Sequence, residues 1–401
     1  MIGVNGQFFL NFKVGGKNGF ITDLDDLIKF SIIERAGNIL PQFILTFYTR
    51  DEGIFPLLNE TNDLEVSFGE SKDNLDDMTL NVLKLNSLGS SGGVKELISV
   101  TGCLSKIEYL SYKKLASYKN LSGVEALKEV VSQHFTPVFN IERSEDKQTW
   151  IQPSWTDRRM IQEIWLHSYL SKSFIACGIT SNSEFILKDM KKNITDYAFK
   201  FTQNPESSKD IPYDSDLTIE CTTGFINNWV GYGQEMLVEN TDTGQKQLAS
   251  AEIQPIIALT DQVVKNAKIA KRRHSTKLVN SNVHENYWLA YVKNITLLAS
   301  LSSVRVQLSF QKRFPKIKLL DLVMLKVDGL NTQGSSEYRS GLYYVSKIVK
   351  TISNKQIVVI VDLVRESFNF VKGDYLSPPV NAGESEFSIS DALSDDEVDL
   401  T

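Results

Sequence analysis

Apolar and polar residues alternate with a period of two in two separate parts of the chain, residues 6–110 and residues 217–371. Side chains on a β-strand point alternately to opposite faces, so this period predicts strands with one apolar and one solvated face. Leu64, Val66 and Phe68 follow this pattern in the first part, and residues 304–310 follow it in the second. We therefore expect a mainly β protein with two similar antiparallel β-barrel domains.

Several short strands are expected in each part, separated by polar turns. In the first part they cover residues 7–14, 28–32, 43–49, 64–68, 80–85 and 97–110. In the second they cover 217–222, 304–310, 319–327, 341–349 and 356–364. Such spacing favours a barrel or a sandwich. The unbroken apolar run Ile357–Val361 indicates a central strand that is covered on both faces.

A stretch with helical patterns separates the two β-regions. Ser122 and Glu125 have the spacing of a capping box at a helix start, and a second helix is expected from Thr156-Asp157. A hairpin is expected over residues 174–187, and further helices over 260 to about 274 and over 284–302. The predicted organisation is a first barrel (1–110 with about 191–240), an inserted α/β domain (111–190), a second barrel with a helical segment at about 260–302 (241–375), and an acidic extended tail (376–401).

The negative charge of the chain is concentrated at its C-terminal end. The formal net charge is -6, yet seven acidic residues and no Lys or Arg follow Lys372, so the remainder is nearly neutral (43 basic against 42 acidic residues). A segment of this composition cannot bury enough surface to fold alone. It is either a solvated terminus or a strap that orders on a partner, with Phe387, Ile389 and Leu393 as anchors.

The composition excludes some classes of protein. A hydrophobic fraction of 42% with no long apolar run argues against a membrane-spanning chain. The first residues lack the pattern of a signal peptide, so we expect synthesis and folding in a cytosol. Cys103, Cys177 and Cys221 are expected to be buried thiols in that reducing compartment.

No convincing catalytic, cofactor or metal site is predicted. Residues 89–93 match G-x-S-x-G, but their flanks read as strands, which favours a hairpin loop over a nucleophile elbow. Ser111 and Lys114 match S-x-x-K without the rest of that signature. Glu163 and His167 lie one helical turn apart but lack a third ligand, so they are expected to be a surface or boundary pair.

A basic segment without acidic residues lies between Gln262 and His284. Its first three cations fall on one stripe of the expected helix. That stripe is either a solvated helix face, a nucleic-acid contact, or a docking patch for an acidic surface such as the tail of a neighbouring subunit. The docking patch consists of Lys265, Lys268, Lys271, Arg272 and Arg273.

The order of several segments resembles the baseplate hub protein of contractile phage tails, which is related to the hub part of type VI secretion spike proteins. The resemblance covers roughly residues 6–371. Relatives often have a Gly-Asp turn where this chain has Leu320-Asp321, and a histidine where it has Lys350. The segments that carry the resemblance are Leu27–Glu34, Gly37–Pro41, Trp150–Pro153, Asp157–Trp165, Leu320–Val323, Gly341–Val345 and Leu363–Ser367.

The resemblance implies a homotrimeric structural hub in the virion's tail baseplate, without a cofactor, made in the host cytoplasm. Three copies of two barrels would adapt a six-fold tail tube to a three-fold spike. The implied partners are the tail tube or tube-initiator protein, the central spike, and wedge and tape-measure proteins, but no membrane and no sequence-specific nucleic acid. Two other functions stay open: a tail-associated cell-wall hydrolase, which needs convergent carboxylates or a metal, and a receptor- or carbohydrate-binding tail protein, which needs exposed aromatic residues on loops.

Overall fold

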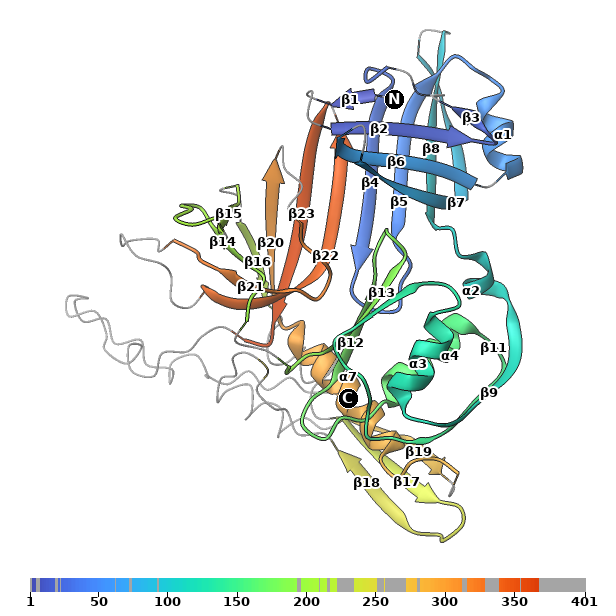
Figure 1. The fold of residues 1–401 in the computed structure, drawn as a ribbon, viewed down its shortest axis with the longest axis vertical. Coiled ribbons are helices and arrows are strands. Elements are labelled where there is room, and N and C mark those ends of the chain that lie inside the picture. The colour runs from blue at the N-terminus through green and yellow to red at the C-terminus, as the bar shows by residue number, and fades with distance from the viewer. Residues whose placement is uncertain are drawn as a thin grey trace, which may run out of the picture. The chain divides into compact units, whose positions relative to one another are not determined.

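The protein is mainly β, and two of the described helices lie in an insertion between two β-regions (Figure 1). The described helices are α1 (Ile54–Thr61), α2 (Ile107–Ser111), α3 (Gly123–Val131), α4 (Asp157–His167) and α7 (Tyr287–Leu301). The computed structural model describes residues 2–4, 8–18, 21, 23–61, 63–71, 74–91, 94–192, 196–208, 210–214, 217–221, 234–250, 256, 272–279, 282–311, 316–328, 339–353 and 355–367.

The N-terminal region is an antiparallel sheet that folds over its own core. Its strand order is β1-β2-β6-β7-β8-β5-β4, and in Figure 1 β2 and β6 cross over β4 and β5. Phe12 of β2 meets Phe30 of β4 edge to face, with ring centroids 5.3 Å apart. Among the described residues, strand pairing does not close this sheet into a complete barrel. Its two ends meet through side-chain packing across the core, as between Phe12 and Phe30. Its strands are β1 (Ile2–Val4), β2 (Phe8–Val14), β3 (Lys17–Asn18), β4 (Leu27–Arg35), β5 (Gln42–Thr49), β6 (Asp63–Ser71), β7 (Asn74–Ser91) and β8 (Lys95–Leu104).

Strand β7 connects the part of the sheet that contains β2 and β6 to the part that contains β8, β5 and β4. Its first residues pair with β6, and from Leu80 onward it pairs with β8. At this corner the strands approach so closely that a Cβ on Gly102 would lie 1.9 Å from the carbonyl oxygen of Asn81 and 2.4 Å from Phe43. Glycine is therefore required at position 102, because every other residue would collide with a backbone atom.

The C-terminal strands continue the same sheet. Strand β22 pairs along one edge with β4, and Ser31 and Thr351 share a hydrogen bond of 2.9 Å across this seam. On its other edge β22 pairs with β23, and near its start, on the same edge as β4, it pairs with β21. The two β-regions are thus hydrogen-bonded to each other. The C-terminal strands are β20 (Val304–Gln311), β21 (Leu322–Leu325), β22 (Gly341–Ser353) and β23 (Gln356–Arg365).

Three strands between residues 191 and 240 pair with this C-terminal group. Strands β14 (Phe199–Thr202) and β15 (Asp210–Pro212) lie parallel to β21, and β16 (Leu217–Cys221) pairs with β20. The alternation of residues 217–221 identified a strand, but such a pattern does not specify a partner. The pairing therefore differs from the expected assignment of this segment to the first barrel, and the division into domains stays a prediction.

The insertion contains two small sheets and two helices. Ser122 and Glu125 form the expected capping box at the start of α3, and the expected hairpin is formed by β12 and β13. Helices α3 and α4 pack their apolar faces into one core. The strands of the insertion are β9 (Lys113–Leu121), β10 (Thr136–Phe139), β11 (Gln148–Thr156), β12 (Ile175–Ile179) and β13 (Glu184–Asp189).

Directional hydrogen bonds fix the insertion to the β-regions. The buried Glu34 accepts from the backbone nitrogen of Ser181 at 2.7 Å, and Asn38 donates to the carbonyl of Arg158 at 2.7 Å. On the C-terminal side Lys188 pairs with Asp321 at 2.9 Å. Each of these contacts joins residues more than 100 positions apart, so the insertion is anchored on two sides.

Helix α7 packs against the insertion with a partly polar face. Asn294 donates to the carbonyls of Leu166 and Ser168 at 3.0 and 2.9 Å, and Lys293 donates to those of Leu170 and Ser171 at 2.5 and 2.8 Å. These carbonyls lie at and beyond the C-terminal end of α4, where a helix leaves its acceptors unpaired. Buried polar residues therefore complete the helix end.

The expected apolar stripe of α7 is correct only in part. Val292 is buried, whereas Trp288, Tyr291, Ile295 and Leu298 are half-buried. The helix begins at Tyr287 rather than at His284, and it contacts a small third sheet. That sheet consists of β17 (Gln234–Asn240), β18 (Lys246–Ser250) and β19 (Arg272–Val279).

Three further expectations need correction. The strand expected over 97–110 ends at Leu104, because the chain leaves the sheet there and turns into α2. Cys221 is exposed on β16, although Cys103 and Cys177 are buried as expected. Strand β23 is paired on both edges, but Val358 and Ile360 are half-buried, so one face of its apolar run is incompletely covered.

Candidate docking surface

The predicted basic patch does not lie on one helix. Arg272 and Arg273 begin β19, whose backbone pairs in parallel with β17, so a helix extending to His274 is wrong at its end. Lys265, Lys268 and Lys271 lie outside the described residues, as do the tail anchors Phe387, Ile389 and Leu393.

The insertion presents a different surface, which the sequence reasoning missed. Strands β9 and β11 form a two-stranded antiparallel sheet, with α3 and α4 on its inner side in Figure 1. Alternate residues on both strands are exposed, and the residues between them are buried or half-buried. Tyr118, Trp150 and Gln152 belong to the inner face. The outer face has no covering element among the residues that the structure describes.

The centre of this outer face is apolar. Leu115 is 80% exposed and Ile151 is 63% exposed. Leu115 pairs with Pro153, and Ile151 pairs with Ser117, so these four residues form a compact quartet on neighbouring strands. Exposed leucine and isoleucine side chains in such a cluster are typical of a surface that binds another chain. We call the face formed by Lys113, Leu115, Ser117, Lys119, Thr149, Ile151 and Pro153 the β9–β11 face.

The charge on this face has one sign. Lys113 and Lys119 are exposed at either end of the apolar centre, and neither β9 nor β11 contains an acidic residue. Beyond the end of β11, Arg159 stacks on Trp155 with the guanidinium 4.2 Å from the ring centroid. The β9–β11 face therefore favours a partner that combines apolar side chains with negative charge.

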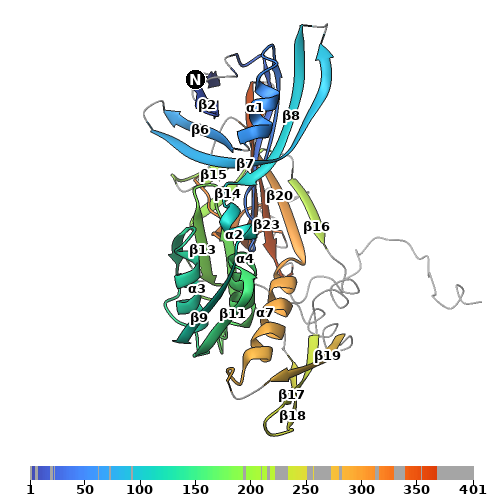
Figure 2. The same cartoon turned by 90° about the vertical axis from the view of Figure 1, so that its right-hand side faces the viewer.

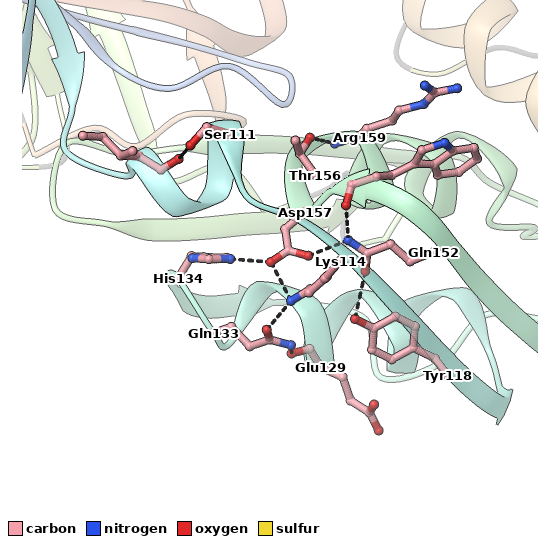
Figure 3. Close-up of polar contacts among 12 residues, drawn as sticks. Ser111, Lys114, Tyr118, Glu129, Gln133, His134, Gln152, Thr156, Asp157 and Arg159 are labelled. Atoms are coloured by element: carbon pink, nitrogen blue, oxygen red, sulfur yellow. Dashed lines mark hydrogen bonds and ion pairs between the residues drawn. The ribbon is translucent and has the colours of Figure 1, made fainter.

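A buried polar cluster supports the inner side of the sheet (Figure 3). The carboxylate of Asp157, at the first position of α4, lies 2.6 Å from His134 Nε2 and 2.7 Å from Lys114 Nζ. Gln152 of β11 donates to the same carboxylate at 2.8 Å. The cluster joins β9, β11, the end of α3 and the start of α4, so it holds the sheet against both helices.

The electrostatics of Asp157 fit a structural role. Burial alone would raise its pKa, but hydrogen bonds from His134, Lys114 and Gln152 outweigh burial and hold the pKa below its ordinary value. The carboxylate is thus charged and occupied by protein donors. Ser111, the nearby serine of the S-x-x-K match, donates to the carbonyl of Ile107 instead of approaching His134 (Figure 3). This arrangement lacks a nucleophile–base pair.

The Glu163–His167 pair is also structural. His167 is only 3% exposed, so it is a buried residue and not a surface one. Its ring stacks on Tyr287 with centroids 3.9 Å apart, and burial lowers its pKa, which favours the neutral form. Tyr287 donates to Glu163 at 2.6 Å. The pair therefore ties α4 to α7, and the described residues contain no group of three or more metal-ligating side chains.

The described part of the G-x-S-x-G match, residues 89–91, ends β7, and Ser91 pairs with Lys95 of β8, so the expected hairpin forms here. Gly89 adopts a φ of +105°, which glycine tolerates and other residues do not. In Figure 2 this hairpin extends beyond the neighbouring strands. No described helix is long and apolar enough to cross a membrane.

Comparison with solved structures identifies the fold. A tail protein from Neisseria meningitidis MC58 superimposes with a TM-score of 0.56 at 11% identity, covering 90% of this chain and 97% of that one. The 43 kDa tail protein of prophage MuSo2 from Shewanella oneidensis gives a TM-score of 0.55 at 10% identity, covering 90% of this chain and all of that one (100%). No protein-family model and no curated protein sequence matches the chain. The resemblance found in the sequence is therefore confirmed at the level of structure: this chain has the fold of phage tail proteins.

Proposed function

We propose that this protein is a structural component of a phage tail, and more specifically a baseplate hub. The observation that carries the proposal is the match to two complete tail proteins over 90% of the chain. Because the match includes both β-regions and the insertion, it concerns the whole architecture and not one common module. The protein would then be part of a virion, at the tail baseplate.

The internal construction supports a mechanical role. The seam between β4 and β22 makes the two β-regions one hydrogen-bonded sheet, and the insertion is anchored to both. The buried cluster at Asp157 and the buried histidine of α4 are occupied by protein partners. Such features resist deformation and leave little for catalysis, which favours a structural part over a cell-wall hydrolase.

The assembly that we propose is a homotrimeric ring. Each chain would contribute its N-terminal and C-terminal β-regions, so that three chains present six positions to a six-fold tube and three to a spike. The proposed partners are the tail tube or tube-initiator protein and the central spike, with wedge and tape-measure proteins at the periphery. The exposed apolar residues Leu83 and Leu88 on the β7–β8 hairpin are candidates for contacts between subunits or with the tube.

The mass of the purified protein in solution tests this proposal. Native mass spectrometry at micromolar concentration is expected to show a species of three times the 45.2 kDa of one chain. Negative-stain class averages of that species should show a ring with an axial channel. A persistent monomer that neither forms rings nor joins the tube and spike proteins from the same phage would contradict the hub assignment.

A further inference from the structure

We propose that the contact between α4 and the N-terminal half of α7 is an acid-sensitive latch. The sensor is His167, whose neutral ring holds the two helices together and whose protonation separates them. Opening would release the first turns of α7 together with the small sheet of β17, β18 and β19. The latch lies within one chain, so it is independent of the proposed trimer.

The hydrogen bonds of His167 fix its protonation state in the closed contact. Nδ1 lies 2.8 Å from the carbonyl oxygen of Glu163. A carbonyl oxygen can only accept, so Nδ1 carries the proton and Nε2 is the unprotonated nitrogen of a neutral ring. Nε2 is buried and has no hydrogen-bond partner among the residues that the structure describes. A second proton would therefore sit on a nitrogen without an acceptor, and the ring would become a buried cation.

Aromatic side chains surround this ring. Tyr287 and Tyr291 of α7 stack on it, with centroids 3.9 and 5.0 Å away, and Trp288 meets it edge-on at 5.1 Å. Behind them Trp150 of β11 packs against Tyr287, and β11 contains no charged residue. A cation gains some energy over a tyrosine face, but this gain does not replace the hydration that a buried charge loses. Protonation of His167 is therefore expected to weaken the contact between the helices.

Charged side chains face this aromatic cluster from α4, α7 and β19. Glu163 of α4 lies 3.6 Å from Nδ1 of His167 and favours the charged ring. Lys277 of β19 lies over Trp288 at 5.6 Å, and Lys293 of α7 binds carbonyls just beyond the end of α4. Both lysines oppose a further positive charge. Burial outweighs the carboxylate and holds the pKa of His167 below its ordinary value, which agrees with the geometry.

The two halves of α7 belong to different cores. Leu297 and Leu301 are buried with the C-terminal strands, whereas Val292 is buried against the small sheet. Figure 2 shows α7 beside α4, with β17 and β18 near one end of the helix. Weakening the contact with α4 would therefore free the N-terminal half of α7 and the sheet that packs on it. The C-terminal half would stay in its own core, and such a local opening costs less than global unfolding.

The direction of the pKa shift sets the pH window. The pKa of His167 is lower in the closed latch than its ordinary value of 6.5. The closed form therefore has its full stability above that pH and loses stability as the pH falls below it. While the closed form stays neutral, the opening equilibrium increases about ten-fold between pH 7.5 and 5.5. The open form is thus more populated in mild acid.

Hydrogen exchange of the full chain, followed by mass spectrometry at these two pH values, measures the opening. After correction for the intrinsic pH dependence of exchange, protection in residues 287–294 should fall about ten-fold at the lower pH, whereas protection in α3 should not change. His167→Phe keeps an aromatic ring in the stack but cannot be protonated. Protection in residues 287–294 of this variant should therefore be the same at both pH values.

Two further variants identify the sensor. His284 precedes α7, and its Nδ1 accepts from the backbone nitrogen of Asn286 at 3.2 Å, so it is the matched control. His284→Gln should retain the acid response of residues 287–294. Glu163→Gln keeps an acceptor for Tyr287 but removes the carboxylate that favours the charged ring, so the response should move to lower pH.

Four outcomes would overturn the proposal. Protection in residues 287–294 of the wild type that is equal at both pH values would show that the contact does not respond to acid. A response that persists in His167→Phe, or that disappears in His284→Gln, would assign it to another group. An equal loss of protection in α3 would show that acid unfolds the whole unit. If His167→Phe fails to fold, Glu163→Gln decides, because a response at unchanged pH in that variant would also exclude His167 as the sensor.

Discussion

Leu320 occupies a backbone conformation that leucine ordinarily avoids. Its φ is +64°, in the left-handed region, and its side chain is buried. The turn is held by hydrogen bonds from Leu320 N to the carbonyl of Val345 at 2.8 Å and from Lys318 N to the carboxylate of Asp321 at 2.9 Å. The conformation therefore belongs to the turn, and leucine tolerates its cost in exchange for burial.

This balance predicts an inverted ranking of two substitutions. Leu320→Ala loses the buried side chain, at about 3 kcal/mol, and keeps the left-handed cost of roughly 1–2 kcal/mol. Leu320→Gly loses the same side chain but relieves that cost, against an entropic penalty of about 0.5–1 kcal/mol for glycine. The glycine variant should therefore be more stable than the alanine variant by up to about 1.5 kcal/mol, although glycine is normally the worse of the two.

Urea unfolding followed by circular dichroism measures the ranking. The neighbouring Leu319 is equally buried but does not have a positive φ, so it is the matched control. At position 319 the alanine variant should be more stable than the glycine variant. If Leu320→Ala proves as stable as Leu320→Gly, or more stable, then residue 320 does not adopt the left-handed conformation in solution and the reasoning fails.

Three further predictions concern the corner and the buried charges. Gly102→Ala should destabilise the protein by about 2–3 kcal/mol in urea unfolding, since the new methyl group would collide with the Asn81 carbonyl, and an unchanged midpoint would refute the close approach. Asp157→Asn should reduce the melting temperature at pH 7. The difference from wild type should shrink as the pH falls through the lowered pKa of Asp157. The reason is that the stability contributed by the carboxylate is present above its ordinary pKa of 3.8 and is lost when it is protonated. Burial lowers the pKa of Lys293 to about 8 from 10.5, so the folded state should gain stability as the pH rises from 8 to 10.5. Lys293→Met should remove that part of the pH dependence. Parallel profiles of stability against pH for the wild type and the variant would contradict this reasoning.

Local patterns in the sequence predicted most of the elements. Period-two alternation located strands such as β4, β6 and β20, and the Ser122–Glu125 spacing located the start of α3. These predictions succeed because the signal lies within a few residues and reports which face of an element is buried. Such a pattern does not report what covers that face.

Partners distant in sequence were therefore harder to predict. The β4–β22 seam joins residues about 320 positions apart, and β16 pairs with β20 rather than with the N-terminal strands. The β9–β11 face was missed for a related reason. Its alternation of Leu115 with Ala116 and of Ile151 with Gln152 was available, but leucine and isoleucine on a strand are ordinarily assigned to a core, and only the structure shows them to be exposed.

The polar face of α7 shows what such exceptions contribute. Apolar residues at positions 293 and 294 would have satisfied the helical pattern and packed against α4. They would also have removed the donors to four carbonyls, those of Leu166, Ser168, Leu170 and Ser171. Apolar packing also tolerates sliding, whereas hydrogen bonds to individual carbonyls fix one register. We therefore expect Asn294→Leu to weaken the docking of α7 on the insertion more than it lowers overall stability. Hydrogen exchange in residues 166–171 measures that docking, and protection there equal to wild type would show that apolar contacts alone hold the helix in place.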